Sequence, residues 1–193
     1  MVEKVPVAST DFTWRMADNL YFQAANWEHT IAGMTFGHVA MYYGKMATGE
    51  QMIIESIGRG VTVRSLTSYV GETVEVKRTT LTDDQCAGVI AAAGAIDNDP
   101  DAFYNYWGIA RFAVPKLLLL RFGGLMPKDW DAYLKLLAYT YKDTRWKICS
   151  QLVADSFSNA GFQLVSPAIG IPLPDDCAAS PLLTDMGPVI IQV

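Results

Sequence analysis

The sequence predicts an α+β fold, in which an antiparallel sheet or small barrel packs on a cysteine-bearing helix. Short runs rich in β-branched, aromatic and apolar residues, separated by glycines, occupy residues 36–79 and are typical of a strand meander. Helix-like patterns follow over residues 82–160. Strands in one part of a chain and helices in the next favour α+β over alternating α/β units.

The strand elements are defined by composition and by the glycines between them. Four strands are predicted, at Phe36–Tyr43, Gln51–Ile57, Val61–Leu66 and Thr73–Thr79. In the last of these, valines alternate with charged residues, which predicts one buried and one exposed face. Residues 1–35 are mixed, and we expect a short strand or helix with loops there. A last strand is expected near 189–193, after a proline-punctuated tail.

The helical elements begin with a capping signal. Thr82 and Gln85 have the spacing of a capping box, which predicts a helix start that continues to Ile96. A second helix is predicted from Cys149 to Ala160, where Gly161 ends it. Two further helices are predicted at 107–122 and 129–142.

The segment 105–145 is long and apolar for a simple connection. We expect a helical insertion that covers a cleft, selects a substrate, or contacts a partner or a membrane. Arg111, Lys116 and Arg121 interrupt its apolar stretch, which argues against a membrane-spanning helix. A buried core helix explains the segment better than membrane contact, although the cations suit a membrane interface.

Length, composition and charge narrow the class of protein. A chain of 193 residues that is 51% hydrophobic suits a single domain with a real core, here expected to span 1–193. A net charge of −5 gives no electrostatic reason to bind nucleic acid. The start of the chain has no apolar signal-peptide core. We therefore expect a cytoplasmic protein, or one delivered by a route such as assembly into a particle.

Cysteine and histidine usage excludes several site classes. The three cysteines are odd in number and form no C-x-x-C pair, which argues against a disulfide framework and a structural zinc site. We expect Cys86 and Cys177 to be structural. The two histidines lie in different settings and the carboxylates are scattered, so neither a metal nor a cofactor is expected.

Cys149 is the candidate nucleophile. A cysteine at a helix start lies near unpaired backbone N–H groups and the positive end of the helix dipole, and both favour the thiolate. Taken alone, a buried structural cysteine is the more common case.

His38 and Glu55 are each the odd polar residue in an apolar strand. A histidine in such a strand needs a hydrogen-bond partner, and a buried carboxylate is costly unless it is paired. If their two strands pair, Glu55 reaches His38 and orients its imidazole, as the third member of a triad does. Taken alone, His38 is better explained as a satisfied core histidine or an edge residue, and Glu55 is explained equally well as an edge-strand glutamate in water. With Cys149, they complete a nucleophile, base and orienter.

The blocks that hold these residues resemble a known family. They read H-V-A-x-Y-x-G, then I-E-S-x-G-x-G-V-x-V-x-x-L, then C-S-x-L-V-A-x-x-F-x-x-A-G. This order is similar to that of the circularly permuted NlpC-type papain-like cysteine hydrolases, also called YiiX-like, in which the sheet precedes the cysteine helix. The likeness spans roughly 36–66 and 146–183.

The resemblance implies a thiol hydrolase with Cys149 as nucleophile, His38 as base and Glu55 as its orienter. Tyr104 and Ser150 become candidates for the oxyanion site or the cleft lining. Amide cleavage by a peptidase or amidase is the first expectation, and cell-wall peptides are the family's best-known substrates. A lipid-directed thiol esterase or acyltransferase is the alternative within the same chemistry. A non-catalytic component of a larger assembly that keeps the fold is the alternative from another class.

Overall fold

The fold is given by a computed structural model, which describes residues 3–6, 19–24, 35–99, 102–104, 146–169 and 171–192. Over these residues it is α+β. The helices predicted at 107–122 and 129–142, and most of the expected insertion at 105–145, lie outside the described residues.

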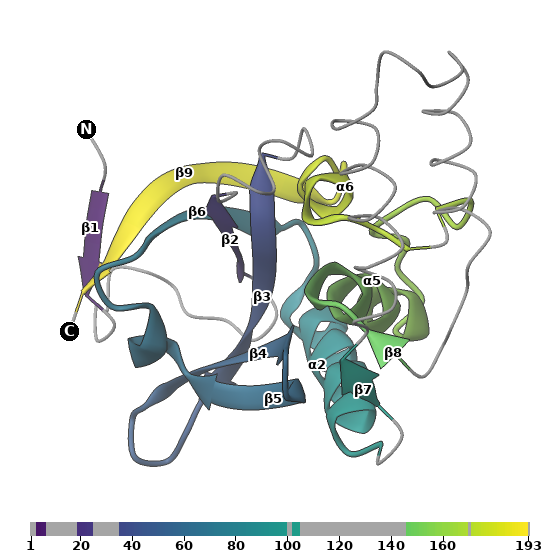
Figure 1. The fold of residues 1–193 in the computed structure, drawn as a ribbon, viewed down its shortest axis with the longest axis horizontal. Helices are drawn as coiled ribbons and strands as arrows, with labels where there is room; N and C mark the ends of the chain where they lie inside the picture. Colours follow the sequence, from purple (N-terminus) through teal and green to yellow (C-terminus); the bar gives the residue numbers. More distant parts are fainter. Residues whose placement is uncertain are drawn as a thin grey trace, which may run out of the picture.

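A seven-stranded sheet forms the body of the molecule, in the order β1-β9-β6-β2-β3-β4-β5. Its strands are β1 (Glu3–Pro6), β2 (Asn19–Ala24), β3 (Phe36–Lys45), β4 (Gln51–Ile57), β5 (Gly60–Ser65), β6 (Thr73–Thr79) and β9 (Leu183–Gln192). The six strands from β9 to β5 are antiparallel to their neighbours, whereas β1 runs parallel to β9. The sheet curls, so that it has an inner and an outer side (Figure 1).

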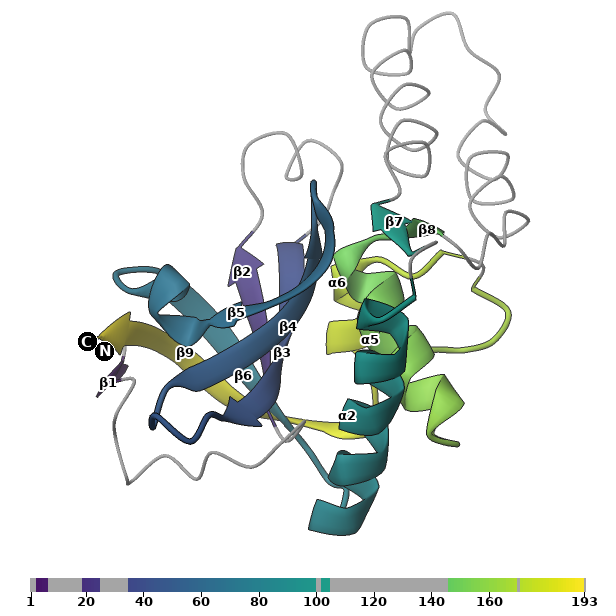
Figure 2. The same cartoon turned by 90° about the horizontal axis from the view of Figure 1, so that it is seen from below.

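Helices cover the outer side of the curled sheet, as Figure 2 shows. They are α2 (Asp83–Asp97), α5 (Cys149–Asn159) and the short α6 (Pro174–Ala178). A 3-10 turn, η1 (Leu66–Tyr69), follows β5, and β7 (Phe103–Tyr104) pairs in parallel with β8 (Trp146–Lys147). No helix of the described ranges is long and apolar enough to cross a membrane.

The central strands and the helices α2 and α5 lie where the sequence predicts them, to within one or two residues at most ends. The capping box is present: Thr82 Oγ1 accepts the Gln85 N–H, and Gln85 Oε1 accepts the Thr82 N–H. Helix α5 begins at Cys149, with Ile148 as an extended N-cap residue.

The N-terminal part, for which the sequence left a short strand or a helix open, supplies the strand β2 to the middle of the sheet. Leu20, Tyr21 and Phe22 are consecutive and fully buried. A strand buried on both faces shows no alternation of polar and apolar residues, so its periodicity could not be recognised in the sequence.

The last strand is longer than predicted, since β9 begins at Leu183 rather than near 189. Pro188 faces Glu75 on β6, while β1 pairs with β9 only from Val189 onward. The proline therefore sits where one side of the strand has no partner among the described strands, and its missing N–H is tolerated there.

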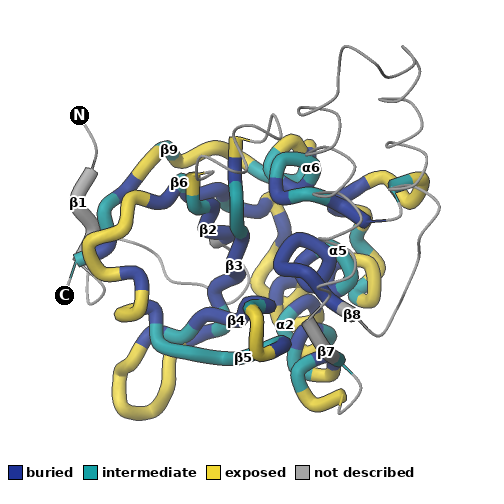
Figure 3. The backbone as a smooth tube through the Cα atoms, viewed as in Figure 1, coloured by how far each residue is buried: buried dark blue, intermediate teal, exposed yellow. Residues whose placement is uncertain are grey.

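Two hydrophobic cores lie on the two sides of the sheet. Alternate residues of β3 divide between them: Val39 and Met41 pack with the helices, whereas Ala40 and Tyr42 belong to the inner core. Figure 3 shows the continuous burial along β3 and α5. By the same alternation, His38 on β3 belongs to the inner set of positions.

Candidate active site

Helix α5 presents Cys149 at its first residue, against the sheet. Its apolar residues Leu152, Val153 and Phe157 are fully buried in the outer core, which fixes the helix on the sheet. No side chain caps the helix start. The unpaired N–H groups there are therefore available to a negatively charged sulfur.

His38 lies between Cys149 and Glu55. Its Nε2 is 2.7 Å from Glu55 Oε2, and its side chain is also hydrogen-bonded to Cys149. With Nε2 engaged by the carboxylate, Nδ1 is the ring nitrogen that remains for the sulfur. The imidazole thus connects a thiol to a carboxylate, as the base of a triad does.

The electrostatics of the pair favour a thiolate beside an imidazolium. Burial opposes protonation of His38, but the Cys149 charge and then Glu55 raise the pKa of the imidazole from 6.5 to about 10. Burial also opposes ionisation of Cys149, yet His38 and backbone hydrogen bonds from Val39 and Ser150 lower the pKa of the thiol below its ordinary 9.0. Because the two groups titrate together, these shifts belong to the pair.

Glu55 is completely buried, and both of its oxygens have partners. Oε2 accepts from His38 Nε2 and from the Tyr69 hydroxyl, each at 2.7 Å. Oε1 forms an ion pair with Arg64 Nε. The Arg64 guanidinium also lies 5.4 Å from the centre of the Tyr69 ring. Burial raises the pKa of Glu55, and its hydrogen bonds and cations together lower it below the ordinary value.

Three contacts fix the chain around the site. Ser56 Oγ donates to the Lys147 carbonyl at 2.8 Å, which joins β4 to the residues before Cys149. The Asp175 carboxylate accepts the Phe36 N–H at 3.0 Å, two residues before His38. The Lys147 ammonium pairs with Asp155 on α5.

The hydroxyl of Ser150 points away from the site. Ser150 is fully buried, and its Oγ donates to the Pro172 carbonyl at 2.6 Å. The Ser150 amide is the group that contacts the Cys149 sulfur, and the predicted oxyanion or cleft-lining role of Ser150 stays a prediction.

Tyr104 belongs to β7, where it pairs with Lys147 of β8. Its side chain lies outside what the structure describes, and so its predicted role remains a prediction.

The other two cysteines, Cys86 and Cys177, are buried, and neither forms a disulfide. Cys177 Sγ lies 3.5 Å from the Ser150 carbonyl. Burial and the negative charges of Cys149 and Asp176 raise the pKa of Cys177 well above its ordinary value, so this thiol is protonated where Cys149 is not.

Sequence reasoning missed Tyr69 and Arg64, the two partners of Glu55 other than His38. Arg64 is opposite Ile53 in the β4–β5 pairing, so it lies diagonally from Glu55. The signal that would have indicated Arg64 is a cation on the neighbouring strand, at a position diagonal to the buried acid and on the same face of the sheet.

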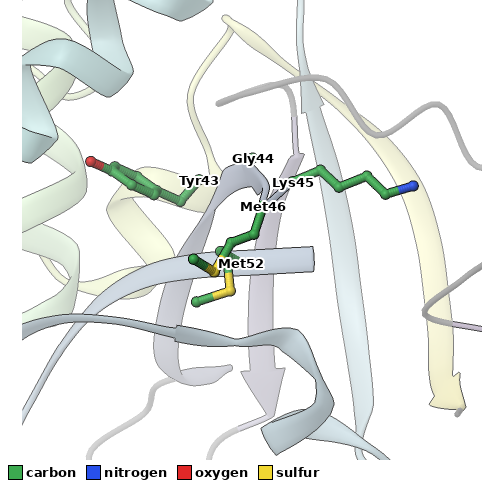
Figure 4. Close-up of a pocket in the computed structure, with 5 residues that line it drawn as sticks. All are labelled: Tyr43, Gly44, Lys45, Met46 and Met52. Atoms are coloured by element: carbon green, nitrogen blue, oxygen red, sulfur yellow. The ribbon is translucent and has the colours of Figure 1, made fainter. Parts of the chain in front are cut away.

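A shallow pocket lies at the opposite end of β3 from His38. Tyr43, Gly44, Lys45, Met46 and Met52 line it. Figure 4 shows the two methionine side chains close together and Lys45 extending away from them. The pocket holds no nucleophile or acid, so we do not assign chemistry to it.

Comparison with known proteins supports the fold. No protein-family model matches the chain, and no curated protein matches it. Among solved structures, the chain is similar to YiiX from Escherichia coli O157:H7, which is described as a metalloprotein. The TM-score is 0.57 at 12% identity, over 90% of this chain and 97% of that chain. The chain has a YiiX-like α+β fold, and at this identity the likeness shows the fold alone.

Proposed function

We propose that the chain is a thiol hydrolase with a permuted papain-like site. Cys149 is the nucleophile, His38 the general base and acid, and Glu55 the group that orients His38. The observation that carries the proposal is the placement of one imidazole between a thiol and a buried carboxylate, 2.7 Å from the latter. A structural cysteine needs no such partners.

The reaction follows from this arrangement. The Cys149 thiolate attacks the substrate carbonyl, and backbone N–H groups at the start of α5 stabilise the oxyanion. His38, protonated in the ion pair, donates its proton to the leaving group as the carbon–nitrogen bond breaks. His38 then takes a proton from water, which attacks the thioester and releases the acid and the thiolate. Glu55 stabilises the imidazolium in both steps.

The substrate class is proposed on chemical grounds and on the family resemblance. The chemistry admits an amide or an ester, and the resemblance favours an amide in a peptide, with a cell-wall peptide as the first to test. A lipid ester serves the same mechanism and is the other outcome of a substrate comparison.

A metal does not fit this residue set. Among the described residues, no group of three or more His, Cys, Asp or Glu side chains is placed to hold an ion. Both oxygens of Glu55 are occupied by His38, Tyr69 and Arg64. We therefore derive no step through the metal that the description of YiiX indicates for that protein.

The test is the rate of iodoacetamide alkylation at each cysteine at neutral pH, read by peptide mass spectrometry. Cys149 is expected to react much faster than Cys86 and Cys177, and His38→Ala is expected to remove the difference. Hydrolysis of peptidoglycan fragments and of a phospholipid ester is measured in parallel, with Cys149→Ala as the blank. Equal labelling of the three cysteines in the folded protein would overturn the proposal.

A further inference from the structure

We infer that Tyr69 and Arg64 are positioning residues, which together hold Glu55 as a charged carboxylate in the orientation that His38 requires. The inference rests on the proposed function and adds two residues to the triad. Neither contacts Cys149 in the described structure, so their effect on the thiol passes through Glu55 and His38.

The first argument is the burial of Glu55. Its exposed fraction is zero, and a carboxylate taken wholly out of water binds a proton unless other groups replace its hydration. His38 supplies one donor. The Tyr69 hydroxyl supplies the second, at 2.7 Å, and Arg64 supplies the compensating charge at the other oxygen. With these two partners in place, Glu55 stays an acceptor and does not become a competing donor toward His38.

The second argument is charge balance. Glu55 and Arg64 form one neutral pair, and the Cys149 thiolate and His38 imidazolium form another. If Arg64 is replaced by a neutral residue, the buried cluster carries a net negative charge. Taking up a proton at Glu55 or at Cys149 removes that charge. Both routes reduce the thiolate, the first because His38 loses its carboxylate partner.

The third argument is the way the two residues are held. Tyr69 is 1% exposed and ends η1, while Arg64 is on β5, immediately before the Ser65 N-cap of the same turn. The Arg64 guanidinium lies over the Tyr69 ring. Burial and the neighbouring Glu55 charge raise the pKa of Tyr69, so its hydroxyl remains a donor at every pH of interest.

The experiment measures the pH midpoint of Cys149 alkylation by iodoacetamide, a readout that does not require the substrate. In the wild type we expect a midpoint below the ordinary thiol value. Tyr69→Phe is expected to raise it by about one pH unit, a tenfold loss of thiolate on the acid side, since a hydrogen bond to a charged group is lost. Arg64→Met is expected to raise it at least as far, and Arg64→Lys to restore part of the shift.

Matched controls separate positioning from general stability. Tyr42→Phe removes another buried tyrosine hydroxyl of the inner core, one that donates to Gln51. Lys77→Met removes a cation paired with Glu75 and Asp185 on β6 and β9. Both control variants are expected to leave the Cys149 midpoint unchanged.

A double-substitution cycle gives the decisive comparison. In a Glu55→Gln background, Tyr69→Phe is expected to produce no further shift, because the carboxylate through which Tyr69 acts is absent. The inference is overturned if Tyr69→Phe shifts the midpoint equally with and without the Glu55 carboxylate. It is also overturned if the wild-type midpoint is low and neither Tyr69→Phe nor Arg64→Met changes it. If Tyr69→Phe does not fold, the Arg64 pair of variants decides alone. A wild-type midpoint at the ordinary thiol value overturns the proposed function instead.

Discussion

The hydrogen bond from Ser56 to the Lys147 carbonyl joins the sheet to the residues before Cys149, and its loss has a predictable cost. Ser56 is fully buried and Lys147 is 6% exposed, with 2.8 Å between the two oxygens. Ser56→Ala removes the donor and leaves the carbonyl short of one partner. A buried polar group in that state costs about 1–3 kcal/mol. For a chain of this length, that loss lowers Tm by roughly 2–12 °C.

Ser156→Ala is the matched control for Ser56→Ala. Ser156 is equally buried, and its Oγ donates to the Leu152 carbonyl at 2.7 Å. In an α-helix that carbonyl also accepts the N–H of residue 156, so removing the hydroxyl leaves it satisfied. The control is expected to lower the free energy of unfolding by less than about 1 kcal/mol, as for a local back-bond.

The assay pairs thermal unfolding with the rate of Cys149 alkylation. Ser56→Ala is expected to reduce both, because Lys147 is two residues before Cys149 and a looser connection allows the sulfur to move from His38. Ser156→Ala is expected to change neither to the same degree. If the two variants lose equal stability and alkylate at equal rates, the reasoning about this connection is wrong.

Three further predictions follow from other parts of the structure. In the pH dependence of alkylation, His38→Ala should move the Cys149 midpoint toward 9.0. It should also remove the second inflection expected near pH 10, where the wild-type imidazolium loses its proton. If that inflection persists in the variant, it belongs to another group. Asp155→Asn leaves the buried Lys147 ammonium unpaired. In urea unfolding, the free energy of unfolding should fall by less than the roughly 3–5 kcal/mol lost when a fully buried pair is broken, but by more than in Lys147→Met. A larger fall in Lys147→Met would contradict this account. Gly88→Ala should stabilise α2 by about 0.5–1 kcal/mol, because a methyl group there meets nothing closer than 4.0 Å; a lower Tm would show an unforeseen clash.

The sequence was most informative where a run of β-branched, aromatic and apolar residues is bounded by glycines, or where a helix has a capping or stop signal. Strands β3 to β6 and helices α2 and α5 lie where their patterns predict them. For β2 the sequence left strand and helix open, because its buried run has neither alternation nor flanking glycines. The length of β9 escaped because prolines and glycines usually interrupt a strand, and only the pairing shows that Pro188 is placed where its missing N–H does not matter.

The candidate site was predictable for a different reason. His38 and Glu55 each break an apolar strand, and such exceptions are costly unless they are paired. Arg64 was not predicted because charged side chains on strands are usually exposed, and the Arg64 side chain is 39% exposed. The role of Tyr69 was not predicted because it lies in a short turn, where the sequence has no periodic pattern of burial.

Without Arg64 and Tyr69, the proposed triad does not by itself explain the ionisation of the Cys149 thiol. A buried Glu55 with His38 as its single partner would be a poor anion, and a neutral Glu55 could not hold an imidazolium. On the proposed function, the thiolate form of Cys149 therefore depends on a cation from β5 and a hydroxyl from η1. On this reasoning, a chain that keeps the cysteine, histidine and glutamate but lacks both of these partners would retain the geometry of the site and lose much of its thiolate.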